Sequence, residues 1–170
     1  SRLSFEENVK NTRKAVEECS ALKIGVEGEL GAIGKAADGV PEDYTDPLDA
    51  AKYVQETGVT ALAIAVGTAH GRYKKAPVLA IERIKEIKNK TNAYLVLHGG
   101  SGVPDEQVRA AIKAGIRKVN FGTDLCYSYL DEIFKTDRSK VAVDLFMAGP
   151  IEAVKKFAES KIELLGAENG

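Results

Sequence analysis

The chain has 170 residues, a net charge of −1 and a hydrophobic content of 44%, which are ordinary values for a globular domain with a core. No basic stripe suggests a nucleic-acid partner, and no apolar run is long enough to cross a membrane. Cys19 and Cys126 lie far apart in predicted helices, so we expect reduced thiols and a cytoplasmic protein.

Helical and strand-like segments alternate along the chain. Ser4 and Glu7 have capping-box spacing, which predicts a helix from Ser4. Gly58 and Gly115 follow further helical segments and are typical helix ends. The periodicity predicts helices over 4–19, 46–57, 79–88, 104–114 and 124–134, and a last helix that starts at Pro150 and ends at Leu165. It predicts strands over 24–30, 59–66, 94–97 and 117–121.

This order predicts the α/β class, with a parallel sheet covered by helices. Four βα units are half of an eightfold (β/α) barrel, a fold that typically needs ~250 residues. Barrels and doubly wound sheets both keep their sites at the carboxyl ends of their strands. Functional residues are therefore expected where the predicted strands end.

Polar residues occupy all of these strand ends. Glu29, His70, His98 and Asn120 each fall there, and His70 and His98 are the only two histidines of the chain. Two imidazoles at neighbouring strand ends could share a zinc ion, with Glu29 as a further ligand. The alternative is a pair of hydrogen-bonded histidines in tight turns and a buried acid bonded to a loop.

Two glycine-rich loops indicate a phosphate site. They read Gly99-Gly100-Ser101 and Asn120-Phe121-Gly122-Thr123, and in barrels the loops after the last two strands commonly bind phosphate. Lys74 offers a mobile positive charge, although a solvated lysine and ordinary turns are the alternatives. The chain has no dinucleotide fingerprint, Walker motif or nucleophile elbow, and Lys118 lies within a predicted strand, where it is poorly placed for Schiff-base chemistry.

Taken together, the motifs resemble the class II (zinc-dependent) ketose-bisphosphate aldolases, which act on fructose or tagatose 1,6-bisphosphate. The resemblance runs in order over essentially the whole chain and rests on Val26-Glu27-Gly28-Glu29-Leu30-Gly31, Tyr44-Thr45-Asp46-Pro47, Gly67-Thr68-Ala69-His70-Gly71 with Tyr73-Lys74, His98-Gly99-Gly100-Ser101-Gly102, and Lys118-Val119-Asn120 with Thr123-Asp124.

The resemblance implies a TIM barrel of which residues 1–170 form the C-terminal four βα units. The N-terminal half, which in the family carries a third zinc histidine and an acid/base aspartate, is expected before Ser1. We therefore expect a 170-residue fragment to be inactive by itself. The resemblance also implies a cytoplasmic homodimer or homotetramer that acts in glycolysis or related carbohydrate metabolism, with a small sugar phosphate as its partner.

The resemblance also assigns roles to residues. It implies that His70 and His98 bind Zn²⁺, that Glu29 lies at a second or alternative metal position, and that Asn120 is catalytic and steadies the substrate. Backbone near Gly71 and Gly99 is expected to hold a monovalent cation, Na⁺ or K⁺. The expected phosphate ligands are Gly71, Lys74, Gly99, Gly100, Ser101, Asn120, Phe121, Gly122 and Thr123.

One position departs from the family pattern. Ala37 stands where many members carry a loop glutamate, and Asp38, Glu42 or Asp43 is left open as its replacement in proton transfer. The expected activity is metal-dependent aldol cleavage of a ketose 1,6-bisphosphate to dihydroxyacetone phosphate and glyceraldehyde 3-phosphate. The alternatives are a non-catalytic fragment that binds a sugar phosphate or a metal, and another metal-dependent barrel enzyme such as an epimerase.

Overall fold

The computed structural model describes residues 3–31, 44–71 and 73–167. Its chain forms two compact units, Ser1–Asn120 and Phe121–Gly170. The first unit contains the sheet and the predicted metal ligands, and the second contains two helices. Ala37, Asp38, Glu42 and Asp43 lie outside the described residues.

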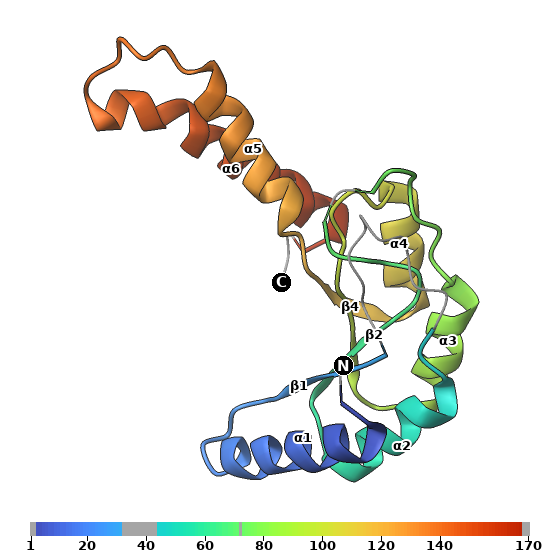
Figure 1. The fold of residues 1–170 in the computed structure, drawn as a ribbon. Coiled ribbons are helices and arrows are strands. Elements are labelled where there is room, and N and C mark those ends of the chain that lie inside the picture. The colour runs from blue at the N-terminus through green and yellow to red at the C-terminus, as the bar shows by residue number, and fades with distance from the viewer. Residues whose placement is uncertain (1–2, 32–43, 72, 168–170) are drawn as a thin grey trace. The chain divides into compact units, whose positions relative to one another are not determined.

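The first unit is built on one four-stranded parallel sheet (Figure 1). Its strands are β1 (Glu27–Leu30), β2 (Ala61–Ile64), β3 (Tyr94–Leu97) and β4 (Ile116–Val119), and they are arranged in chain order. The helices are α1 (Phe5–Ser20), α2 (Pro47–Thr57), α3 (Ile81–Lys90) and α4 (Asp105–Ala114), each packed against the next. The predicted parallel α/β arrangement is therefore confirmed.

Helix ends follow the local chemistry of the sequence. Ser4 and Glu7 form the predicted capping box of α1, with the Glu7 backbone N–H donating to the Ser4 hydroxyl at 3.2 Å. Asp46 accepts from the backbone N–H groups of Leu48 and Asp49 and so begins α2. Gly58, in the left-handed region at φ +72°, ends that helix.

The two faces of the sheet differ sharply in chemistry. One face carries Leu62, Ile64, Leu95, Leu97 and Ile116, all fully buried, and these side chains form the core with the helices. The opposite face carries a row of register partners, Glu29, Ala63, Val96 and Lys118. Side chains alternate along a strand, so every second residue of each strand is presented on this second face.

Three of the strands are shorter than the sequence predicts. The apolar patterns over 24–30, 59–66 and 117–121 extend beyond the paired residues of β1, β2 and β4. A strand lasts only as long as its neighbours continue the hydrogen-bond ladder, whereas burial continues into the loops, for example at Ala65 and Val66. The apolar pattern therefore overestimated the paired length of these strands, and burial supports it over 59–66 but not throughout 24–30, where Ile24 is 56% exposed.

The second unit is a pair of helices, α5 (Thr123–Lys135) and α6 (Val143–Leu165), packed against each other. The prediction that a helix starts at Pro150 is wrong, because Pro150 is buried inside α6. Proline removes one helical hydrogen bond, and contacts with α5, such as Tyr129 Oη with Met147 Sδ at 3.6 Å, support the turns before it. No helix in the described part of the chain combines the length and apolar character of a membrane span.

Candidate metal and phosphate site

A network of charged side chains crosses the second face of the sheet. The two ring nitrogens of His98 each pair with a carboxylate: Nδ1 lies 3.0 Å from Glu29 Oε2, and Nε2 lies 2.9 Å from Glu27 Oε1. The other oxygen of Glu27 accepts from Lys118 Nζ at 2.7 Å. Side chains from β1, β4 and the end of β3 thus meet over the sheet.

Strand β2, which lies between β1 and β3, allows the two acids to reach His98 because its side chains on that face are small. Ala61 and Ala63 are the register partners of Glu27 and Glu29, and a methyl group leaves room for the longer acids to extend across β2. Glu27 and Glu29 are two residues apart on one strand, so both carboxylates leave the sheet on the same face. The alternation therefore places both carboxylates on the face of the sheet where they contact His98.

Glu27 was not among the residues that the sequence analysis singled out. Burial raises the pKa of its carboxyl group, but hydrogen bonds from Lys118 and His98 and their charges outweigh burial and hold the pKa below its usual value. Glu27 is therefore a carboxylate at neutral pH. The signal that could have found it is its spacing from Glu29, since residues i and i+2 of a strand share a face.

The imidazole of His70 lies beside that of His98. The ring centroids are 6.0 Å apart and the rings are tilted by 53°. His70 is exposed and follows β2, whereas the side chain of His98 is only 15% exposed. The topology thus brings together the two histidines that the sequence analysis paired.

These two rings fit a shared zinc ion. Two imidazoles bound to one zinc at ~2.0–2.1 Å have centres roughly 5–6 Å apart, and a carboxylate on the second ring nitrogen is the usual partner of a ligating histidine. Metal binding through either ring nitrogen of His98 requires the carboxylate that now contacts that nitrogen to move away. Among the described residues no set of three His, Cys, Asp or Glu side chains is arranged to hold a metal ion.

Glu29 is bonded to His98 in the structure, and its role at a second or alternative metal position stays a prediction. Asn8, on α1, also donates from Nδ2 to the backbone carbonyl of Glu29 at 2.9 Å. The end of β1 is therefore held by α1 as well as by the sheet.

Hydrogen bonds join each strand end to the next. The Thr45 hydroxyl donates to the Leu30 carbonyl at 2.7 Å and accepts from the Ala65 N–H at 2.8 Å, which links the ends of β1 and β2. The Gly100 N–H donates to the Asn120 carbonyl at 3.0 Å, which links the ends of β3 and β4. Between these two links, the Tyr73 hydroxyl connects the loops after β2 and β3.

The predicted phosphate ligands of the first unit lie in the loops after β2 and β3 and at the end of β4. Gly99, Gly100 and Ser101 are buried, Gly71 and Asn120 are half-buried, and Lys74 is exposed. Phe121, Gly122 and Thr123 belong to the second unit, where Thr123 begins α5 and Lys161 Nζ lies 5.2 Å from the Phe121 ring centre. The phosphate, catalytic and monovalent-cation roles assigned to these residues remain predictions.

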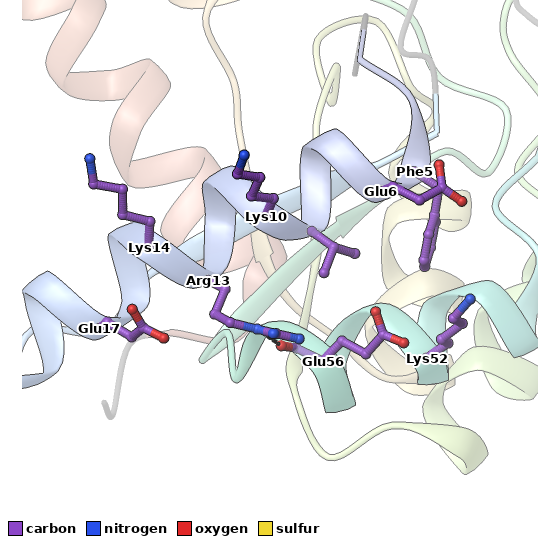
Figure 2. Close-up of a pocket in the computed structure, with 9 residues that line it drawn as sticks. Phe5, Glu6, Lys10, Arg13, Lys14, Glu17, Lys52 and Glu56 are labelled. Atoms are coloured by element: carbon purple, nitrogen blue, oxygen red, sulfur yellow. Dashed lines mark hydrogen bonds between the residues drawn. The ribbon is translucent and has the colours of Figure 1, made fainter.

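A groove elsewhere in the first unit is lined by neither of the two histidines. It lies between α1 and α2 and has a volume of about 340 Å³ (Figure 2). Arg13 donates from Nε to the Glu56 carbonyl at 2.6 Å, and Lys52 lies over the Phe5 ring. The basic and acidic side chains along it are mixed, and neither histidine is present.

The chain is similar to known aldolases in sequence and in structure. A family model described as fructose-bisphosphate aldolase class-II matches residues 1–170. The YdjI aldolase from Escherichia coli K12 has a similar structure, with a TM-score of 0.88 and 36% identity over 99% of the chain. A candidate fructose-1,6-biphosphate aldolase from Coccidioides immitis is 27% identical over 98% of the chain, with a TM-score of 0.87.

A more distant likeness supports the fold alone. The fructose-bisphosphate aldolase of Campylobacter jejuni has a TM-score of 0.78 with 24% identity over 98% of the chain. The chain spans 60%, 61% and 58% of the lengths of these three proteins. That share is consistent with the predicted half barrel.

Proposed function

The chain belongs to the class II fructose-bisphosphate aldolase family, and on this premise we propose that the full-length protein is a zinc-dependent aldolase. Its proposed reaction is the reversible cleavage of a ketose 1,6-bisphosphate, of the fructose or tagatose series, to dihydroxyacetone phosphate and glyceraldehyde 3-phosphate. The observation that carries the proposal is the pairing of the His70 and His98 rings, 6.0 Å apart, at neighbouring strand ends.

In this proposal His70 and His98 hold the metal. When bound, zinc supplies Lewis-acid chemistry that polarises the substrate carbonyl. One of the two acids that contact His98 keeps its imidazole oriented while the other ring nitrogen is released to the metal. Lys118 balances the charge of Glu27, which limits the repulsion between two neighbouring carboxylates.

The glycine loop next to His98 is the proposed phosphate-binding element. Gly99, Gly100 and Ser101 lie in the loop between β3 and α4, a few residues before the helix starts at Asp105, and the backbone N–H of Gly100 donates to the Asn120 carbonyl at 3.0 Å. Backbone N–H groups near a helix start attract anions, and Lys74 adds a mobile charge. Contacts with the phosphate, away from the reacting bond, supply orientation and binding energy, and Asn120 is proposed to steady the substrate.

The proposed partner is therefore a small sugar phosphate. The proposal also includes a monovalent cation near Gly71 and Gly99. It further includes a homodimeric or homotetrameric assembly and a cytoplasmic role in carbohydrate metabolism. A non-catalytic sugar-phosphate-binding protein and a metal-dependent epimerase are the competing functions.

The deciding experiment measures retro-aldol cleavage by the full-length protein with fructose and tagatose 1,6-bisphosphates. We expect cleavage that a chelator abolishes and zinc restores, and a loss of both zinc and activity in His98→Ala. Ser160→Ala, in α6, is the matched control, because its hydroxyl donates within its own helix turn, to the Phe157 carbonyl. Binding without cleavage would favour the non-catalytic alternative, and stereochemical inversion without cleavage would favour the epimerase.

A further inference from the structure

Tyr73 bonds to the two loops that carry the candidate metal ligands. Its hydroxyl oxygen accepts from the Ala69 N–H at 2.7 Å. Its single proton faces two carbonyl oxygens, that of Ala69 at 2.7 Å and that of Gly99 at 3.0 Å. Ala69 immediately precedes His70 in the sequence, and Gly99 immediately follows His98.

The same two loops are in close backbone contact. Gly99 has φ +70°, and a side-chain carbon there would lie 2.5 Å from the Ala69 carbonyl oxygen. A carbon at Gly102 would lie 3.1 Å from the ring of Tyr73. The tyrosine ring therefore packs against one end of the glycine loop while its hydroxyl binds the other end.

We propose that Tyr73 is a positioning residue that sets the spacing between His70 and His98. The inference rests on the proposed function, because the spacing matters for a metal that the two rings share. The bonds made by Thr45 link the ends of β1 and β2, and the bond from Gly100 to Asn120 links those of β3 and β4. The hydroxyl of Tyr73 makes the corresponding link between the loops after β2 and β3.

His70 needs such a link more than His98 does. His98 is held by two carboxylates, whereas His70 is exposed, so packing alone restrains its ring weakly. Fixing the backbone of Ala69 relative to Gly99 restricts the positions that the His70 ring can adopt. Without the hydroxyl, one N–H and two carbonyl groups lose their shared partner, and the loops can separate.

The test compares Tyr73→Phe with the unmodified full-length protein. Phenylalanine keeps the ring against Gly102 and removes only the hydroxyl. Thr45→Val is the matched control, because it removes a buried hydroxyl that joins a different pair of strand ends, those of β1 and β2. Three properties are measured: amide hydrogen exchange of Ala69 without metal, zinc affinity by competition with a chromophoric chelator, and the absorption spectrum of the cobalt-substituted protein.

We expect Tyr73→Phe to accelerate exchange at Ala69 by at least tenfold, to weaken zinc binding by about 10–100-fold and to change the cobalt spectrum. Thr45→Val should leave zinc affinity within about twofold of the unmodified protein. Unchanged exchange, or unchanged zinc affinity and cobalt spectrum, would overturn the positioning role. Equal zinc losses in both variants would also overturn it. If exchange responds but the unmodified protein takes up no zinc, the proposed function fails and the link itself stands.

Discussion

Glu27 on the first strand and Lys118 on the fourth are joined by an ion pair of 2.7 Å that crosses both strands between them. Their side chains are 28% and 52% exposed, so water screens part of the attraction. The pair nevertheless connects the two edge strands of the four-stranded sheet.

A double-mutant cycle measures the strength of this link. With Glu27→Gln, Lys118→Met and the double variant, we expect each single change to lower the free energy of unfolding. The pair should show a coupling energy of about 0.2–1 kcal/mol, the range of partly exposed ion pairs. Denaturant unfolding at low and high salt checks this, and additive single effects at low salt would contradict a direct interaction.

Ser101 and Thr123 test the proposed phosphate site. Ser101→Ala and Thr123→Ala should each weaken binding of dihydroxyacetone phosphate by ~0.5–3 kcal/mol, the range from a neutral to a charge-assisted hydrogen bond. Zinc content should stay unchanged, because neither hydroxyl is a proposed metal ligand. Calorimetric titration measures the affinity, with Ser160→Ala as the control, and unchanged affinity in both variants would refute the assignment.

Thr68 tests the cost of a buried hydroxyl. It is 2% exposed, and its oxygen has no hydrogen-bond partner among the described residues. Thr68→Val keeps the shape and removes the unsatisfied group, so we expect the free energy of unfolding to rise by about 1 kcal/mol. The control is Thr45→Val, which should lower it by about 1–3 kcal/mol because its oxygen makes two bonds. A comparable loss in both variants would mean that Thr68 has a partner in solution.

The raised pKa of Tyr53 predicts how the free energy of unfolding changes at alkaline pH. Burial raises the pKa of its phenol above 10.0; a hydrogen bond with Thr12 lowers it in part, and the charge of Glu29 raises it further. The unfolded chain therefore releases this proton at lower pH than the folded chain. The stabilisation is fully present below the unfolded pKa and is lost as pH rises through the folded pKa.

Replacing Tyr53 with Phe should separate the effect of the lost hydrogen bond from the effect of the phenol's ionisation. At neutral pH the variant should lose about 1 kcal/mol of stability, because the phenol also donates to Asn8 Oδ1 at 3.2 Å. Above the ordinary tyrosine pKa its stability should fall less steeply than that of the unmodified protein. Tyr94→Phe, at a side chain that is 60% exposed, is the control, and parallel pH profiles for all three proteins would exclude this role of Tyr53.

Local signals in the sequence explain most of the fold. The capping box at Ser4 and Glu7, the aspartate cap at Asp46 and the glycine at Gly58 act within a few residues, so the sequence alone fixed these helix ends. Pro150 was misread because its local preference for a helix start was overridden by packing between α5 and α6. Such long-range compensation leaves no trace in the local pattern.

Hydrophobic periodicity and glycine-rich turns are local properties, so they were enough to predict the α/β order and to place His70 and His98 at successive strand ends. Tertiary structure alone decided that the two rings lie 6.0 Å apart, that Glu27 joins Glu29 on His98, and that Tyr73 joins the two loops. These contacts depend on strand register and on the small Ala61 and Ala63 side chains between the acids and the histidine. Register is fixed only when separate strands pair, because the partner of each residue is then chosen by the whole sheet.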